Sequence, residues 1–309
     1  MPVNIKYIFL IIYMQIKINE NIDKDTKFFC ENTYIIYGEI RVLEGITLII
    51  EDNTNIYITN GEFTTPKGNK TGKSCLIFET GSTLYAERIY LHACNYFSCP
   101  TYKADNGGIV FLGSSTIAEK DFVPVTFSTK RSNFNATLIY ASYLGAKDKV
   151  HVVKDIDIDD YDAISVIGVN NNEWNIKDIY SEYSGDDGFD IENSDITVQN
   201  ITVKIPNEDG INITSSRVNV IESLNINMTI NKIFDRDIFD LETDDGPAFI
   251  RIAQNCLVNI DGIFGDQLTL VSDDLPQPII TPNGKELPYN FNGYTVNGQS
   301  YVYSGFFSL

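Results

Sequence analysis

Residues 176–220 read IKDIYSEYSGDDGFDIENSDITVQNITVKIPNEDGINITSSRVNV, and this stretch decides the fold because it repeats itself at a constant interval. Apolar residues recur every 22 positions, at Ile176, Val198 and Val220. The dipeptide Asp187-Gly188 recurs at the same interval as Asp209-Gly210. A period of this size, with short strands inside it, is typical of one coil of a parallel β-helix, in which each coil stacks about 4.8 Å above the last.

Strand-like alternation extends beyond this stretch, whereas helical periodicity is nearly absent. Apolar side chains alternate with their neighbours at Ile40-x-Val42, Leu48-x-Ile50 and Ile56-x-Ile58. A further Asp-Asp-Gly occurs at 244–246, where Asp245 follows Asp209 by 36 residues instead of 22. We therefore expect the polar stretch 229–243 to loop out of the solenoid before the coils resume.

Both ends of the chain differ from the repeating middle. Behind Lys6, residues 7–14 form a short apolar stretch that fits either a secretory signal or a strand that caps the fold. The C-terminus is rich in Tyr and Phe, which favours a cap, because an open last coil would polymerise edge to edge; an oligomer contact or a glycan-stacking patch is the alternative. We predict an N-terminal segment 1–26, a parallel β-helix 27–265 and an aromatic-rich C-terminal β cap 266–309.

The charge balance excludes some classes of partner. The chain has 42 acidic and 23 basic residues, which gives a formal net charge of −19. Nucleic-acid-binding surfaces are basic, so we expect no nucleic-acid partner. The charge also disfavours docking on an anionic membrane, and no apolar segment is long enough to span a bilayer. A soluble surface protein, or one that holds cations, fits this composition.

Several segments carry a resemblance to a known group of proteins. They are Tyr37–Glu51, Leu76–Ala86, the glycine-flanked Gly107–Gly113 and the Ser-Gly-Asp-Asp-Gly-Phe element Ser184–Phe189. Over roughly residues 33–226 the chain resembles right-handed parallel β-helix proteins of the pectin-lyase-like superfamily, and above all a subset found in bacterial cell-surface proteins. The resemblance implies an all-β, right-handed parallel β-helix. It implies no particular chemistry, because that subset has none established.

Polygalacturonases in the same superfamily carry Asn-Thr-Asp, Asp-Asp, Gly-His-Gly and Arg-x-Lys motifs. This chain has the Asp-Asp at Asp186-Asp187, but it has no Gly-His-Gly and no Arg-x-Lys after it. The departure argues against hydrolase activity, and a shared fold does not imply a shared function.

The repeated aspartates are the candidate site. Asp187 and Asp209 should occupy equivalent positions on adjacent coils, with their backbones about 5 Å apart. Carboxylates this close repel each other, and a hard cation such as Ca²⁺ would relieve the repulsion. We name Asp186, Asp187 and Asp209 as candidate Ca²⁺ ligands; the alternative is that each aspartate caps a turn whose glycine takes a positive φ. No cofactor is otherwise required.

The same residues carry a catalytic alternative. A glycosidase needs two carboxylates about 5 to 9 Å apart, which Asp187 with Asp209 or Asp190 would satisfy. A lyase needs a base, and Arg251 should point outward because it lies between two inward isoleucines, in the column of Asp190 and Asn212. With two histidines and no partner pattern, Ser-His-Asp and Cys-His chemistry are disfavoured.

Two functions follow from these observations. The first is a non-catalytic protein, exported to a cell surface or carried on a viral particle, that binds or displays; its partner would be a polysaccharide or another surface protein. The alternative is a carbohydrate-active enzyme, either a polysaccharide lyase or a glycoside hydrolase, that acts on acidic polysaccharide. The missing Gly-His-Gly and Arg-x-Lys favour the first.

Overall fold

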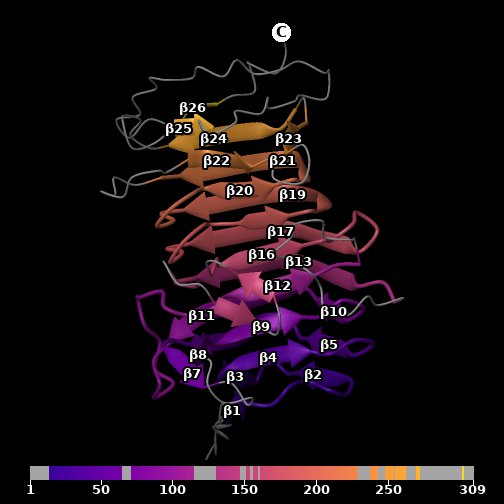
Figure 1. Ribbon diagram of the computed structural model, residues 1–309, viewed down its shortest axis with the longest axis vertical. Helices are drawn as coiled ribbons and strands as arrows, with labels where there is room; N and C mark the ends of the chain where they lie inside the picture. Colours follow the sequence, from indigo (N-terminus) through magenta and orange to yellow (C-terminus); the bar gives the residue numbers. More distant parts are fainter. Residues whose placement is uncertain are drawn as a thin grey trace, which may run out of the picture.

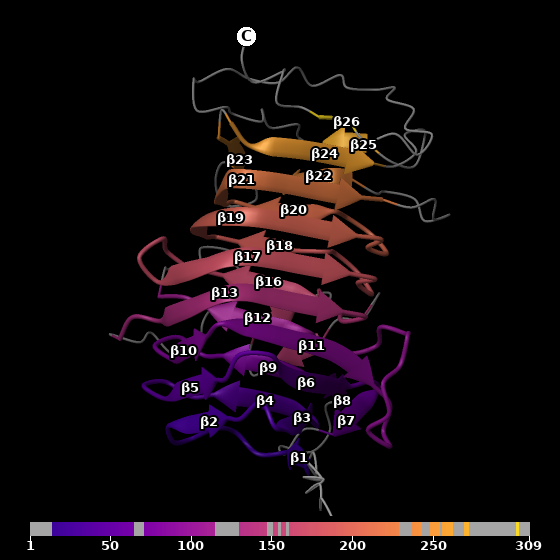
Figure 2. The ribbon, with the colours of Figure 1, turned by 180° about the vertical axis from the view of Figure 1, so that it is seen from behind.

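The computed structural model describes residues 14–64, 71–114, 130–146, 151–153, 156–158, 161–228, 237–242, 248–253, 255–261, 269–271 and 301–302. Within these ranges the chain is an all-β parallel β-helix, as the 22-residue repeat predicts (Figure 1, and from behind in Figure 2). The strands of successive coils stack along the long axis, with β1 near one end and β24 near the other.

Each coil presents three faces, and the chain visits them in the order face 1, face 2, face 3. Face 1 is an eight-stranded parallel sheet. Its strands are β4 (Glu39–Val42), β9 (Cys75–Phe78), β12 (Ile109–Leu112), β16 (Ile164–Ile167), β18 (Asp190–Glu192), β20 (Ile211–Thr214), β22 (Asp237–Glu242) and β25 (Thr269–Val271).

Faces 2 and 3 are two parts of one bent 14-stranded sheet. Face 2 contains β2 (Thr26–Phe28), β5 (Thr47–Ile50), β10 (Thr83–Ala86) and β23 (Phe249–Ile252). Face 3 contains β1 (Met14–Ile18), β3 (Asn32–Ile36), β6 (Thr54–Thr59), β11 (Arg88–Cys94), β24 (Leu257–Asp261) and β26 (Tyr301–Val302). Four long strands run through both faces: β13 (Asn133–Ser142), β17 (Trp174–Glu182), β19 (Asp195–Lys204) and β21 (Arg217–Asn227).

The pairing of β13 shows the bend. Its first part pairs with β10 through Asn133 and Thr83, and its second part pairs with β11 through Leu138 and Arg88. Two short antiparallel hairpins lie outside the coils: β7 (Glu62–Thr64) pairs with β8 (Thr71–Lys73), and β14 (His151–Val153) pairs with β15 (Ile156–Ile158).

Inward ladders of apolar side chains fill the solenoid. Val198 pairs directly with Val220, and Ile176 precedes Val198 by the same 22 residues that separate the paired Ile179 and Ile201. Ile176, Val198 and Val220 are all buried in one core cluster. The predicted inward ladder is therefore present.

Aromatic rings fill part of the core near the middle of the solenoid. Phe78 stacks on Phe111 with 5.2 Å between ring centroids, and Trp174 meets Phe111 edge-on at 5.5 Å. These side chains are buried and project from consecutive coils, so the stack runs along the solenoid axis.

The prediction that residues 229–243 loop out is wrong for their last part. Residues Asp237–Glu242 form β22, which pairs in parallel with β20 on face 1. Phe249–Ile252 then forms β23 on face 2, in register with β21. The chain is therefore back on face 1 by Asp237. Residues 229–236 and the Asp244–Gly246 motif lie outside the described residues.

The ends extend the solenoid in both directions. β1 lies inside the predicted N-terminal segment and pairs in parallel with β3. At the other end, β25 pairs in parallel with β22, whereas β26 runs antiparallel to β24. The apolar stretch 7–13 and most of the predicted cap lie outside the described residues. Among the residues that are described, no helix is long and apolar enough to cross a membrane.

Candidate functional site

Four aspartates on successive coils form what we call the aspartate ladder (Asp162, Asp187, Asp209 and Asp237), at the start of the face 1 strands. The backbone N–H of Asp209 donates to the Asp187 carboxylate at 2.8 Å, and that of Asp187 donates to Asp162 at 3.2 Å. Asp237 donates its N–H to Asp209 in the same way. Asp187 and Asp209 thus lie on adjacent coils as the repeat predicts, and each carboxylate holds the coil that follows it.

The ladder is largely buried, which is unusual for carboxylates. Asp162, Asp187 and Asp209 are 7%, 8% and 7% exposed. Burial raises the pKa of the Asp187 carboxyl well above its usual range, and the nearby Asp209 and Asp162 raise it further. Burial also raises the pKa of Asp209, and the N–H of Asp237 offsets this only in part. Asp187 and Asp209 therefore favour bound protons.

Asp190 lies beside the ladder on β18, in register with Ser165 and Asn212. It is 3% exposed, and its Oδ1 accepts no hydrogen bond from the described residues. Burial, followed by repulsion from Glu192, raises its pKa well above the usual range. A proton or a bound cation would relieve this buried charge.

The candidate Ca²⁺ ligands Asp186, Asp187 and Asp209 do not form a group of three ligand atoms within 4.8 Å of one another. Asp186 is buried next to Asp187, and its carbonyl accepts the N–H of Asn207 at 3.2 Å. In the part of the chain that the structure describes, the one group of three acidic or thiol ligands within 4.8 Å of one another is Cys30, Glu31 and Glu51. That group is largely exposed, and Glu51 already pairs with Lys27 at 2.7 Å.

The catalytic alternative is divided between two faces. Asp187, Asp190 and Asp209 belong to face 1, whereas Arg251 lies on β23 of face 2. Arg251 is exposed, as predicted, but its register partner is Asn219. The prediction that Arg251 shares a column with Asp190 and Asn212 is wrong. Those two residues lie on strands of face 1, whereas β23 lies on face 2, which belongs to a different sheet.

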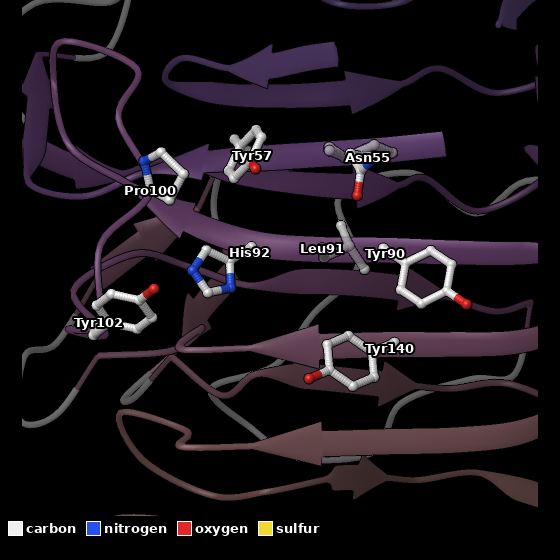
Figure 3. Close-up of a pocket in the computed structure, with 9 residues that line it drawn as sticks. Asn55, Tyr57, Tyr90, Leu91, His92, Pro100, Tyr102 and Tyr140 are labelled. Carbon is white, nitrogen blue, oxygen red and sulfur yellow. The ribbon is translucent and has the colours of Figure 1, made fainter. Parts of the chain in front are cut away.

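A groove on face 3 was not predicted from the sequence. It has a volume of about 340 Å³, within the range of small-molecule sites. Its lining consists of Asn55, Ile56 and Tyr57 from β6, Tyr90, Leu91 and His92 from β11, Tyr140 from β13, and Pro100 and Tyr102 from the following loop. Figure 3 shows the rings of Tyr90 and Tyr140 face-on and neighbouring, with His92 between Tyr57 and Tyr102.

Further tyrosines extend the groove along the solenoid, and we call the whole set the tyrosine cluster (Tyr57, Tyr90, Tyr102, Tyr140, Tyr143, Tyr180 and Tyr183). Tyr140 stacks on Tyr180 with centroids 4.8 Å apart, and Tyr143 stacks on Tyr183 at 4.6 Å. Tyr90 lies 5.7 Å from Tyr140 at a tilt of 46°. Rings on three successive coils thus continue one aromatic surface.

Glu182 fixes this surface from one side. It accepts hydrogen bonds from the hydroxyls of Tyr140 and, at 3.3 Å, Tyr180. Burial, and then the bond to Glu182, raises the pKa of Tyr140. Burial also lowers the pKa of His92, so its imidazole is neutral at physiological pH. The lining of the groove therefore carries no formal charge.

A sequence signal for the tyrosine cluster exists at a different interval from the main repeat. Tyr140-Ala-Ser-Tyr143 and Tyr180-Ser-Glu-Tyr183 are 40 residues apart, so the 22-residue period does not relate them. They become neighbours because the chain between them includes an extra excursion, the β14–β15 hairpin. An outward Tyr-x-x-Tyr repeated at the same point of two strands would have revealed them.

Comparison with family models, with curated proteins and with solved structures finds no match to this chain.

Proposed function

We propose that the protein is a non-catalytic glycan-binding β-helix that is displayed on a cell surface or a viral particle. The observation that carries the proposal is the groove on face 3, with its exposed and half-buried tyrosine rings. Aromatic side chains bury large apolar areas while their hydroxyls form hydrogen bonds, a combination that suits the alternating apolar faces and hydroxyl edges of sugars. The three-faced coils also support the resemblance to the pectin-lyase-like superfamily.

Rigidity supports a binding role for these rings. Tyr140 and Tyr180 are held by Glu182, and Tyr143 is held by its stacking on Tyr183. Side chains that are already ordered lose little conformational entropy when a ligand binds. The alternative partner, another surface protein, would also use an aromatic surface, and the binding experiment below distinguishes the two.

Replacing Tyr140 or Tyr90 with Ala should weaken glycan binding by about 30-fold or more, the effect of losing a central contact worth about 2 kcal/mol. Isothermal titration calorimetry against a panel of soluble polysaccharides measures this. Tyr85→Ala is the matched control, because Tyr85 is a half-exposed tyrosine on face 2, and it should bind as the wild type does. Equal affinity in the Tyr140 variant and the wild type would refute the site, and a panel with no ligand would favour a protein partner.

The second candidate function, hydrolysis or lyase cleavage of acidic polysaccharide, is favoured by one observation. The raised pKa of Asp187 and Asp209 is what a general acid at neutral pH requires. Against it, the two carboxylates are buried and already accept backbone N–H groups, and Arg251 is on another face.

We expect no turnover of uronate polymers by the purified protein. A lyase would release unsaturated products that absorb in the ultraviolet, and a hydrolase would release reducing ends. Arg251→Ala and Asp187→Asn are the variants that test any activity. Product formation that is lost in either of them would support the enzyme candidate and overturn the non-catalytic proposal.

A further inference from the structure

One outward column of face 3 runs through the groove and continues beyond it. Strand register aligns one residue from each of six coils: Asn55, Tyr90, Tyr140, Tyr180, Thr202 and Asn225. None of these side chains is buried, and none carries a formal charge. The spacing between them is that of neighbouring β-strands, about 4.8 Å, which is close to the length of one sugar unit in an extended chain.

The type of side chain in the column changes along the solenoid axis. Rings occupy its middle coils, whereas hydroxyl and amide groups occupy the coils that follow. Asn225 accepts a hydrogen bond from Asn259 of the next coil at 2.8 Å, and its own amide reaches Ser223 at 3.4 Å. Stacking surfaces followed by neutral donors and acceptors suit several successive sugars.

The charges that flank the column are of both signs. Asp178 and Glu182 are acidic, whereas Arg88, which shares a row with Asp178 through Leu138, and Lys204 are basic. Asp178 accepts the amide of Asn200 at 2.7 Å on one side, and Glu182 lies on the other. The cation nearest to Glu182 in this register is Lys204, whose Nζ lies 5.0 Å from the centre of the Tyr180 ring. The column itself favours an uncharged chain, because its six residues offer a uronate no charged partner and the overall charge of −19 would repel a uronate chain.

From this register and this charge pattern we infer that the ligand is an extended, uncharged polysaccharide that lies along the solenoid axis and contacts one column residue per coil. The inference rests on the proposed glycan-binding function and adds the chemical class of the glycan, its direction and a binding surface longer than the groove.

Calorimetry with oligosaccharides of increasing length tests the inference. Neutral oligomers, such as cello- and manno-oligosaccharides of two to eight units, should bind at least about tenfold more tightly as they lengthen, and then reach a plateau. Oligomers of galacturonate of equal length should bind more weakly, and the gap should narrow as salt screens the repulsion.

A matched pair of variants locates the chain. Thr202→Glu places a bulky charge on the column, beyond the groove. Longer oligomers should then bind no more tightly than short ones, while the shortest oligomer still binds. Thr197→Glu makes the same change on β19 at an exposed position of face 2, and should alter nothing. Neither threonine lines the groove.

The outcomes separate the inference from the function on which it rests. If no glycan binds, the proposed function fails. If Tyr140→Ala abolishes binding but affinity does not rise with length, if Thr202→Glu leaves the gain from length unchanged, or if uronates bind more tightly, the function stands and the inference is wrong.

Discussion

Val198→Asp is expected to lower the free energy of unfolding by at least about 3 kcal/mol, because it places an unpaired carboxylate in the centre of the solenoid. Val198 is fully buried and pairs with Val220 on the next coil. A domain of this kind has a total stability of roughly 5–15 kcal/mol, so the loss is a large part of it. Since each coil contacts only its neighbours, the damage should begin with the coils of β17, β19 and β21.

Urea unfolding followed by circular dichroism measures this effect. The control is Thr197→Asp, which introduces the same side chain one residue earlier, where it faces solvent, and should change stability by less than about 0.5 kcal/mol. If the two variants unfold at the same urea concentration, Val198 does not face the core.

The comparison between these neighbours shows why the sequence was informative here. Strand residues alternate between core and solvent, so a constant period fixes which of them stack. Between residues 176 and 220 the coils have equal length, and the repeat predicts the ladder directly. The period fails one step later, where Val198 pairs with Val220 but Asn200 pairs with Ser223. One extra residue in β21 shifts the register, and Ile221 is left 43% exposed.

The unequal coils explain what the sequence did not predict. Asp237 continues the aspartate ladder 28 residues after Asp209, and no glycine follows it, so the Asp-Gly pattern points to 244–246 instead. The tyrosine cluster depends on coils that include hairpins and long loops. Contacts across such coils are set by where the chain rejoins the sheet, and a period read from the sequence does not contain that information.

Stability is expected to rise as the pH falls from 7 towards about 5, the reverse of the usual behaviour of carboxylates. The pKa values of Asp187, Asp190 and Asp209 are raised in the folded state. Between the ordinary carboxyl pKa of about 4 and these raised values, the folded protein binds more protons than the unfolded chain, so the free energy of unfolding decreases as pH increases. Each pKa unit of elevation corresponds to about 1.4 kcal/mol at neutral pH.

The neighbouring carboxylates also raise these pKa values. The exposed ion pairs affect stability at lower pH than the range from 7 to 5. The pKa values of Asp187, Asp190 and Asp209 are raised further by the other two ladder residues, Asp162 and Asp237, and by the nearby carboxylates Glu192, Glu208, Asp240 and Glu242. Glu51 and Asp52, which pair with Lys27 and Arg88, have lowered pKa values. Their contribution to stability is complete above the ordinary carboxyl pKa of about 4 and is lost only as the pH falls below it.

The double variant Asp187→Asn/Asp209→Asn should be more stable than the wild type at pH 7 and should show a flatter pH profile. Asparagine keeps an oxygen that accepts the N–H of the next coil, while the buried charge disappears. Urea unfolding between pH 4 and pH 8 measures both effects. Asp195→Asn, at a half-exposed carboxylate 3.5 Å from Arg217, is the control and should bring no gain. A wild type that loses stability steadily from pH 7 to pH 5 would contradict the raised pKa values.

Bound Ca²⁺ would relieve the same repulsion between carboxylates. Its effect on stability can be measured separately from that of protonation. If Asp186, Asp187 and Asp209 bind Ca²⁺, millimolar Ca²⁺ should raise the melting temperature above the value in Na⁺ of matched ionic strength. A ligand that binds only the folded state adds about 2.7 kcal/mol at a hundredfold excess over its Kd, whereas screening of the −19 charge acts for both ions. The specific part should vanish in Asp187→Asn/Asp209→Asn. Equal shifts in variant and wild type would leave screening alone. Asp187 and Asp209 would then serve only to accept the backbone N–H of the next coil.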